Sequence, residues 1–249
     1  MRSLISTELL KVRTTRAAYV AGGIVALITL VLPVLGALLA GSGDIEPLQP
    51  ADLAGALRAP VALAGGAVLL VGLLSAAGEF RHHTVLTTRL GEPRPTRILL
   101  AKLVTMAGLG LATGVVMTVT TLVEAFAVFR VEGVAYEPMH HGVVRVALAI
   151  PLVLALHGVI GVAIGSLLRN TAAAVGITLV WAFVVEGVVP VVTRQPTMAN
   201  WLPTGLLRQA LETSTAQGQP TPAVAGAIIV VVVAALVAAT AVLDSRREL

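Results

Sequence analysis

The sequence contains no cysteine among its 249 residues, so disulfides, thiolate metal sites and cysteine nucleophiles are excluded. Charged side chains are scarce at 12% of residues, whereas a soluble domain has roughly 25%. Aromatic residues account for only 3%, although 57% of the chain is hydrophobic. The apolar content therefore rests on small and aliphatic side chains, a composition typical of helices that pack tightly or face lipid.

Lysine is rarer still, and its two positions exclude one class of enzyme. Lys11 and Lys102 are the only lysines, and neither follows a glycine. The phosphate-binding pattern G-x-x-x-x-G-K-[ST] is therefore absent, and the chain is not a P-loop ATPase. If ATP drives its function, ATP and Mg²⁺ bind to a separate subunit, and we expect no cofactor in this chain.

Long uncharged runs separate the few charged blocks. A membrane-spanning helix needs about 20 mostly apolar residues, and six runs meet that length. We predict an all-α, polytopic membrane protein with one transmembrane domain over residues 1–249 and no signal peptide. The six spans are expected near residues 17–40, 59–78, 103–128, 144–168, 171–192 and 222–243.

The first sixteen residues form a separate segment. Ile5, Leu9 and Val12 recur at a helical spacing, whereas Glu8 and Lys11 lie between them with other polar residues. An amphipathic pattern beside a span predicts a helix that lies in the membrane interface.

The distribution of basic residues predicts the orientation. With the N-terminus inside, twelve Lys and Arg residues fall in cytoplasmic segments and five fall outside. The positive-inside rule then places both termini in the cytoplasm, in a bacterial cytoplasmic (inner) membrane. The net charge of +4 follows from this topology, and no nucleic-acid partner is expected.

Small residues four apart let membrane helices approach closely. Gly110 and Gly114 have this spacing in the third span, and Gly161 and Gly165 have it in the fourth. A chain rich in glycine and alanine also produces such spacings by chance, and the composition favours this second interpretation.

The polar residues form no catalytic set within the spans, which argues against an intramembrane enzyme. The second outer loop contains possible metal ligands, namely Glu137, Met139, His140 and His141. A metal site needs three or four organised ligands, and adjacent histidines in a helix point in different directions. A solvated loop is therefore the favoured interpretation of these residues, although the sequence alone does not decide whether they bind metal.

The loop over residues 79–102, between the second and third spans, carries the most information. Val85, Leu86 and Leu90 can share one face of a short helix, which Gly91, Pro93 and Pro95 would end. A short amphipathic helix at the cytoplasmic mouth of a bundle suits docking to a soluble partner. A charged loop that merely obeys the positive-inside rule is the alternative.

This loop resembles the corresponding loop of ABC-2 type transporter permeases. The positions that match the pattern are Glu79, Phe80, Thr84, Leu90, Pro93, Arg97 and Lys102, whereas His83 stands where a glycine is more usual. The resemblance extends over the whole chain, through the N-terminal helix, the six spans, Glu186, and Trp201-Leu202-Pro203 before a short helix at Leu206–Leu211.

The resemblance implies that the chain is the permease subunit of an ATP-driven ABC exporter. Two permease chains, identical or different, would form the translocation path, and a separate ATP-binding subunit would engage the loop. The residues expected to couple to that subunit are Glu79, Phe80, Arg81, Thr84, Val85, Leu86 and Leu90. The alternative is a non-transporting membrane component of an assembly or sensor system.

Three ionisable residues lie within or at the edge of the spans. Glu186 is expected inside the outer leaflet, where an unpaired carboxylate costs at least ~2–3 kcal/mol. His157 is its nearest predicted partner, and Glu124 is expected at the outer interface. We predict that all three belong to the translocation path or its outer gate. The largely apolar path favours a hydrophobic or amphipathic cargo, and the sequence does not identify the substrate.

Overall fold

The structure is a computed structural model that describes residues 2–41, 46–81, 84–85, 90–92 and 94–246. Helices dominate these residues, and no strand occurs among them. The helices are α1 (Arg2–Thr14), α2 (Arg16–Leu39), α3 (Asp52–Arg58), α4 (Val61–Arg81), α6 (Pro95–Val131), α7 (His141–Leu168), α8 (Thr171–Leu179), the π-helix η1 (Val180–Val185), α9 (Glu186–Thr193), the 3₁₀-helix η2 (Pro196–Trp201), α10 (Pro203–Gln209) and α11 (Pro222–Arg246).

Six helical segments are long and apolar enough to span a membrane, which confirms the predicted number. They are Arg16–Leu39, Asp52–Arg81, Pro95–Val131, His141–Leu168, Thr171–Thr193 and Pro222–Asp244. The chain therefore has the architecture of a multi-pass helical membrane protein. The short helix predicted at Leu206–Leu211 is α10, which begins and ends a few residues earlier.

The second and third spans begin seven to eight residues before their predicted starts. Those starts were placed just after Arg58 and at Lys102, on the assumption that a charge marks the end of a span. Both side chains are ion-paired, Arg58 to Glu212 and Lys102 to Glu8. Pairing lowers the cost of a charge near the membrane, so the second span includes Arg58, at the end of α3, and α6 continues through Lys102.

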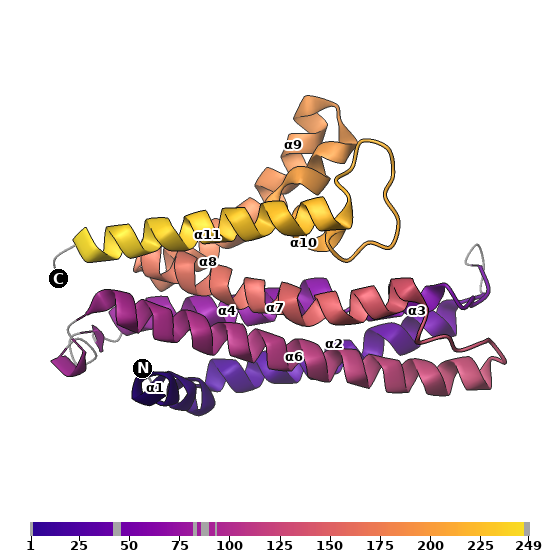
Figure 1. Ribbon diagram of the computed structural model, residues 1–249, viewed down its shortest axis with the longest axis horizontal. Helices are drawn as coiled ribbons and strands as arrows, with labels where there is room; N and C mark the ends of the chain where they lie inside the picture. Colours follow the sequence, from indigo (N-terminus) through magenta and orange to yellow (C-terminus); the bar gives the residue numbers. More distant parts are fainter. Residues whose placement is uncertain (1, 42–45, 82–83, 86–89, 93, 247–249) are drawn as a thin grey trace.

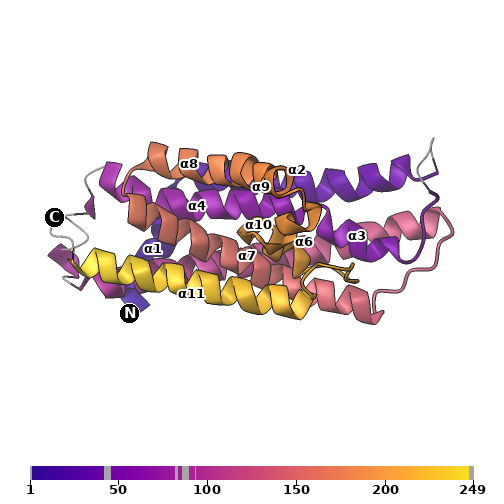
Figure 2. The same cartoon turned by 90° about the horizontal axis from the view of Figure 1, so that it is seen from above.

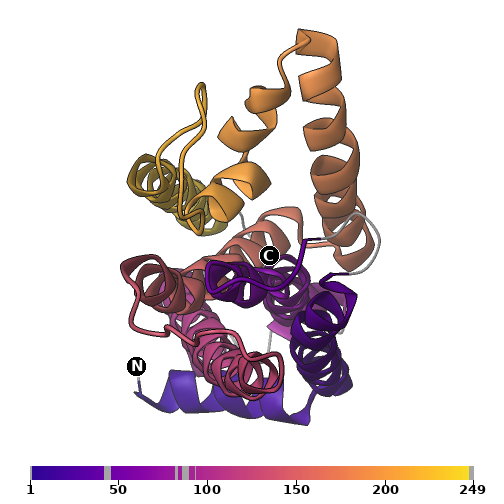
Figure 3. The same ribbon diagram turned by 90° about the vertical axis from the view of Figure 1, so that its right-hand side faces the viewer.

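The helices form an elongated bundle around α7. Helix α7 lies between α4 and α6, and α2 packs against α4 and α6 on one side (Figures 1 and 2). On the other side α11 packs against α7, and the α8–η1–α9 segment diverges from the bundle (Figure 3). Both chain ends lie at one end of the bundle, here called the α1 end; the opposite end, where α3 lies, is the α3 end (Figure 1).

Glycines bring the three central helices into close contact, so their spacing is not the chance pattern that the composition favoured. The residues concerned are Gly110 and Gly114 on α6, and Gly161 and Gly165 on α7. A Cβ atom on Gly110 would lie 2.3 Å from the carbonyl oxygen of Leu154, and one on Gly161 would lie 2.1 Å from that of Leu69. Neither space admits a methyl group, so α6 and α4 pack on α7 backbone to backbone.

The outer helices expose much apolar surface. In span five, Ala174 and Glu186 are the only buried residues, and Phe183 and Val192 are more than two-thirds exposed. Leu38 on α2 and Val231 on α11 are similarly exposed. Soluble monomers rarely expose apolar patches of this extent, whereas lipid or another hydrophobic helix covers them in a membrane.

Candidate functional site

Four charged side chains meet at the α1 end and join three helices. The Lys102 Nζ atom on α6 lies 2.7 Å from Glu8 Oε2 on α1 and 2.7 Å from Glu79 Oε1 on α4. The Lys11 Nζ atom on α1 lies 2.6 Å from Glu8 Oε1 and 2.6 Å from Glu79 Oε1. Both lysines of the chain therefore bind the same two carboxylates. We call these four residues the charge cluster.

The charge cluster is neutral and mostly buried. Glu8, Glu79 and Lys102 are buried, whereas the Lys11 side chain is 38% exposed. Partial burial of the Lys11 ammonium lowers its pKa, but its hydrogen bonds to Glu79 and Glu8 outweigh that effect and raise the pKa above 10.5. A buried ion pair is costly to break because the remaining charge is left uncompensated. The cluster therefore holds α1 firmly against α4 and α6.

The side chains buried on α1 differ from the predicted apolar stripe at two positions, Leu9 and Glu8. Val12 is buried and Ile5 is half-buried, as expected, but Leu9 is exposed. Glu8, which was assigned to the polar side, is buried instead. The reason is that Lys11 and Lys102 neutralise Glu8 against the bundle, which turns Leu9 towards the surroundings.

A second set of contacts lies beside the charge cluster and involves Arg169, which the sequence analysis did not single out. Arg169 ends α7 in a left-handed conformation (φ 52°) and its guanidinium lies 5.1 Å from the centre of the Phe80 ring. Its Nη2 atom also lies 2.7 Å from Asp244 Oδ1 on α11. Arg169 therefore joins the end of α4 to the last helix. Its only sequence signal is its position in the tight turn between two spans.

The structure places the predicted coupling residues in two settings. Glu79 and Phe80 are engaged within the chain, in the charge cluster and under Arg169 respectively. Arg81, Thr84 and Leu90 are exposed, and Leu90 is 87% exposed.

Val85 is half-buried and lines a small hollow with Phe80 and Ile98. Leu86 lies outside the described residues, as do His82, His83, Arg89 and Pro93, so the predicted shared face of Val85, Leu86 and Leu90 stays a prediction.

A cavity of about 780 Å³ lies between α3, α4, α7, α9 and α10. We call it the polar cavity because Arg58, His157, Glu186, Arg208 and Glu212 line it together with aliphatic side chains. Arg58 is paired with Glu212, and Arg208 donates a hydrogen bond to Asn200. The structure thus brings together two of the three predicted path residues, Glu186 and His157.

Glu186 is 9% exposed and follows the π-helix η1 directly. Its Oε1 atom accepts hydrogen bonds from Trp181 Nε1 at 2.9 Å and from the backbone N–H of Thr204 at 3.0 Å. The wide turn of η1 carries the Glu186 N–H to the Trp181 carbonyl, and π-helical turns of this kind recur at functional sites.

Glu186 and His157 line the same cavity, but the hydrogen bonds that they make in this structure go to other groups, so their predicted pairing stays a prediction. His157 is 8% exposed, and its Nδ1 atom lies 2.8 Å from the Val153 carbonyl oxygen, so that nitrogen donates to the backbone. The other edge of the ring lies against Gly65, where a Cβ atom would come within 2.6 Å of Nε2. Glu186 takes its hydrogen bonds from Trp181 and α10 because α10 reaches the same side of the cavity.

Glu124 occupies a different cavity, of about 370 Å³, between α2, α3 and α6. Glu46 and Asp52 also line it. Both carboxylate oxygens of Glu124 are buried, and neither has a hydrogen-bond partner among the described residues. The structure therefore separates Glu124 from the other two predicted path residues.

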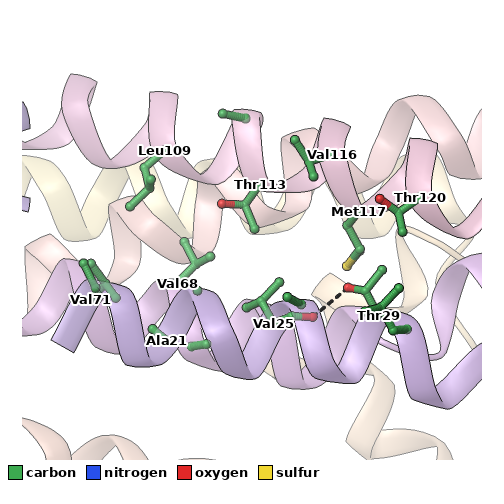
Figure 4. Close-up of a pocket in the computed structure, with 16 residues that line it drawn as sticks. Ala21, Val25, Thr29, Val68, Val71, Leu109, Thr113, Val116, Met117 and Thr120 are labelled. Carbon is green, nitrogen blue, oxygen red and sulfur yellow. Dashed lines mark hydrogen bonds between the residues drawn. The ribbon is translucent and has the colours of Figure 1, made fainter. Parts of the chain in front are cut away.

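A third cavity, of about 540 Å³, lies between α2, α4 and α6 and is almost wholly apolar. Val25, Val68, Leu109 and Met117 contribute to its walls, as Figure 4 shows. Thr29 lies at its edge, with its hydroxyl donating to the Val25 carbonyl oxygen at 2.8 Å. This cavity has the chemistry to receive an aliphatic chain and offers nothing to a charged group.

The outer loop that contains the possible metal ligands Glu137, Met139, His140 and His141 is described in part by its hydrogen bonds. His140 caps α7, because its Nδ1 atom accepts a hydrogen bond from the Gly142 N–H at 3.3 Å. Met139 is exposed. Among the described residues, no three histidine, aspartate or glutamate side chains are grouped so that they can hold a metal ion.

A comparison with protein-family models finds no match, and a comparison with curated proteins finds none either.

Proposed function

We propose that the chain is the membrane-spanning subunit of an ATP-driven exporter of the ABC-2 type. It lies in the bacterial cytoplasmic membrane with both termini in the cytoplasm. A separate ATP-binding subunit docks on residues 79–91 and supplies the energy, together with its own ATP and Mg²⁺. The charge cluster is the observation that supports this proposal most strongly.

The charge cluster lies where a docked subunit would push. Glu79 is the first residue of the proposed docking segment and Lys102 follows the segment. Glu79 is tied to α1 through Lys11, and Lys102 is tied to α1 through Glu8. A force on the exposed part around Leu90 then moves α1, α4 and α6 together rather than bending the segment alone. Such stiffness is what a coupling element between two subunits needs.

The packing of the spans suggests which parts move. The close glycine contacts make α4, α6 and α7 one rigid unit. Backbones packed this closely interlock, so the helices cannot shift by small amounts without a clash. The α8–η1–α9 segment has few buried residues and diverges from this unit (Figure 3). Motion of that segment relative to the rigid unit would open and close the polar cavity, which includes Glu186 and His157.

Two such chains form the working unit in this proposal. The apolar surfaces of α2 and of the α8–η1–α9 segment are exposed in a single chain. A second permease chain, identical or different, would cover part of this surface and close a path between the two. The apolar cavity between α2, α4 and α6 is compatible with a hydrophobic or amphipathic cargo.

Purification of the full chain from its native membrane in mild detergent tests the proposal. A polypeptide with a Walker A motif should co-purify in stoichiometric amount and hydrolyse ATP in a vanadate-sensitive manner after reconstitution. Leu90→Asp should reduce co-purification, whereas Met139→Asp, an equally exposed position at the other end, should not. A pure chain without any nucleotide-hydrolysing partner would favour the alternative, a membrane component of an assembly or sensor system.

A further inference from the structure

The carboxylate of Glu186 has an unusual set of neighbours. Trp181 and Thr204 both donate to its Oε1 atom, and both are neutral N–H groups. Among the residues that the structure describes, none donates a hydrogen bond to Oε2. The carboxylate is thus held by two neutral N–H groups and has no ion-pair partner within the described part of the chain, although it lies within a candidate membrane span.

Each of the two arginines in the cavity wall has a hydrogen-bond partner other than Glu186, a carboxylate for Arg58 and a neutral amide for Arg208. Arg58 is ion-paired with Glu212 and also donates to the Ala54 carbonyl oxygen. Arg208 donates to the Asn200 amide oxygen. His157 donates through Nδ1 to the Val153 carbonyl oxygen, and the Nε2 edge of its ring lies against Gly65, so its hydrogen bond goes to the backbone and not to Glu186. Among the described residues, Glu186 Oε2 is therefore an acceptor in this cavity wall without a donor.

The rest of the cavity wall is aliphatic. Val61, Val153, Leu207 and Leu211 surround the acceptors, and the volume of about 780 Å³ suits a drug-sized ligand. An apolar wall around a few convergent polar groups is typical of small-molecule sites. A ligand that places an ammonium group against Glu186 would supply both the missing charge and the missing donors.

We propose that the polar cavity is a binding site for amphipathic amines, whose ammonium group pairs with Glu186 and whose apolar body lies against the aliphatic wall. Only the role of these amines as transported cargo rests on the proposed function. The site itself exists in the isolated chain and does not need the ATP-binding subunit. Binding is therefore testable even if the chain proves not to be a transporter.

The chain carries a built-in reporter for this site. It has two tryptophans, and Trp201 bonds to the Gly218 carbonyl oxygen away from Glu186. In a Trp201→Phe background, emission comes from Trp181 alone, whose indole N–H bonds to Glu186. Dodecylamine added to this variant in lipid nanodiscs should shift the emission saturably, after subtraction of the signal from amine partitioned into empty nanodiscs. Dodecanol, which has the same chain but no charge, should not.

Glu186→Gln should weaken dodecylamine binding about tenfold or more, because a charge-assisted hydrogen bond is lost. Glu132→Gln, which removes a carboxylate at an exposed position outside the cavity, should leave it unchanged. Equal binding of dodecanol, a shift that does not saturate, or unchanged affinity in Glu186→Gln would each overturn the proposal. In those cases the co-purification experiment still decides the proposed function independently.

A second measurement uses the wild-type chain, so it does not depend on the folding of a variant. An apolar carbodiimide activates a carboxylate, and a bound amine then attacks the activated carbonyl, forms an amide and releases the urea. Dodecylamine held against Glu186 should give an amide adduct there in excess over Glu132, as measured by peptide mass spectrometry. Equal labelling of the two residues, or labelling of Glu132 alone, would contradict the site.

Discussion

Lys102 on α6 reaches Glu8 on α1 across 94 residues of sequence, with 2.7 Å between Nζ and Oε2. The same ammonium lies 2.7 Å from Glu79 on α4, so one buried charge holds three helices together. Lys11 completes the cluster from its more exposed side. The arrangement makes the contributions of the two lysines unequal, which can be measured.

Lys102→Ala should destabilise the folded chain far more than Lys11→Ala. The Lys102 side chain is 5% exposed, and its loss leaves Glu8 and Glu79 close together and short of positive charge. Removing one partner of a buried pair costs about 3–5 kcal/mol, whereas exposed pairs contribute about 0–1 kcal/mol. Thermal unfolding of both variants in the same detergent measures the difference. Equal losses of stability in the two variants would show that the buried Lys102 contributes no more than the partly exposed Lys11.

The pH dependence of α1 docking follows from Lys11. Its folded pKa is raised above 10.5, so its ion pairs stabilise docking at all lower pH values and are lost as the pH rises through the folded pKa. A spin label at exposed Thr7, introduced as the only cysteine, should therefore show constant mobility from neutral pH to about pH 10 and greater mobility above it.

Lys11→Arg is the matched control, because a guanidinium stays charged over this whole range. It should delay the alkaline release of α1. Release at neutral pH, or the same titration in Lys11→Arg, would show that Lys11 does not control the docking.

Gly161 is expected to tolerate no side chain. An added Cβ atom would lie 2.1 Å from the Leu69 carbonyl oxygen, so α7 and α4 would have to separate. Gly161→Ala should cost about 1–3 kcal/mol, the range for overpacking, and lower the yield of monodisperse protein. Gly66→Ala is the control, since a Cβ atom there meets nothing within 4 Å. A Gly161→Ala chain that behaves like Gly66→Ala would contradict the close packing of the two helices.

Topology reporters test the orientation that the basic residues predict. Fusions at residue 92 and at the C-terminus should report a cytoplasmic location, and fusions near residues 48, 136 and 216 should report the opposite side. The excess of Lys and Arg at the α1 end is the physical reason, because positively charged loops are retained on the cytoplasmic side. A C-terminal fusion that reports an external location would overturn the orientation. The docking segment would then lie outside the cell, where a cytoplasmic ATP-binding subunit cannot reach it.

The spans were predictable because the thickness of the hydrocarbon core requires about 20 apolar residues, a length that the sequence displays directly. Their boundaries were less predictable at Arg58 and Lys102, since partners 154 and 94 residues away neutralise these charges. Pairs so distant in sequence depend on how helices pack. The charge cluster was therefore missed as a unit, even though all four of its residues were named for other reasons.

The hydrogen-bond partners of Glu186 were also not predictable from the sequence. Its depth in the membrane follows from its distance along the span, but its partners depend on a π-helical turn and on the approach of α10. A regular helix would have directed the carboxylate differently, and the prediction of His157 as partner assumed such a helix. The glycine spacings were more informative, because close backbone packing needs only small residues at one face.

Photo-crosslinking at Leu90 tests the central claim most directly, because this side chain is 87% exposed within the proposed docking segment. A photoreactive amino acid in its place should crosslink, in native membranes, to a polypeptide that carries a Walker A motif. The same amino acid at Met139, which is 83% exposed at the α3 end, should give no such product. Crosslinking to an ATP-binding subunit from residue 90 alone is the predicted result, and its absence there, or its appearance at residue 139 instead, would contradict the account.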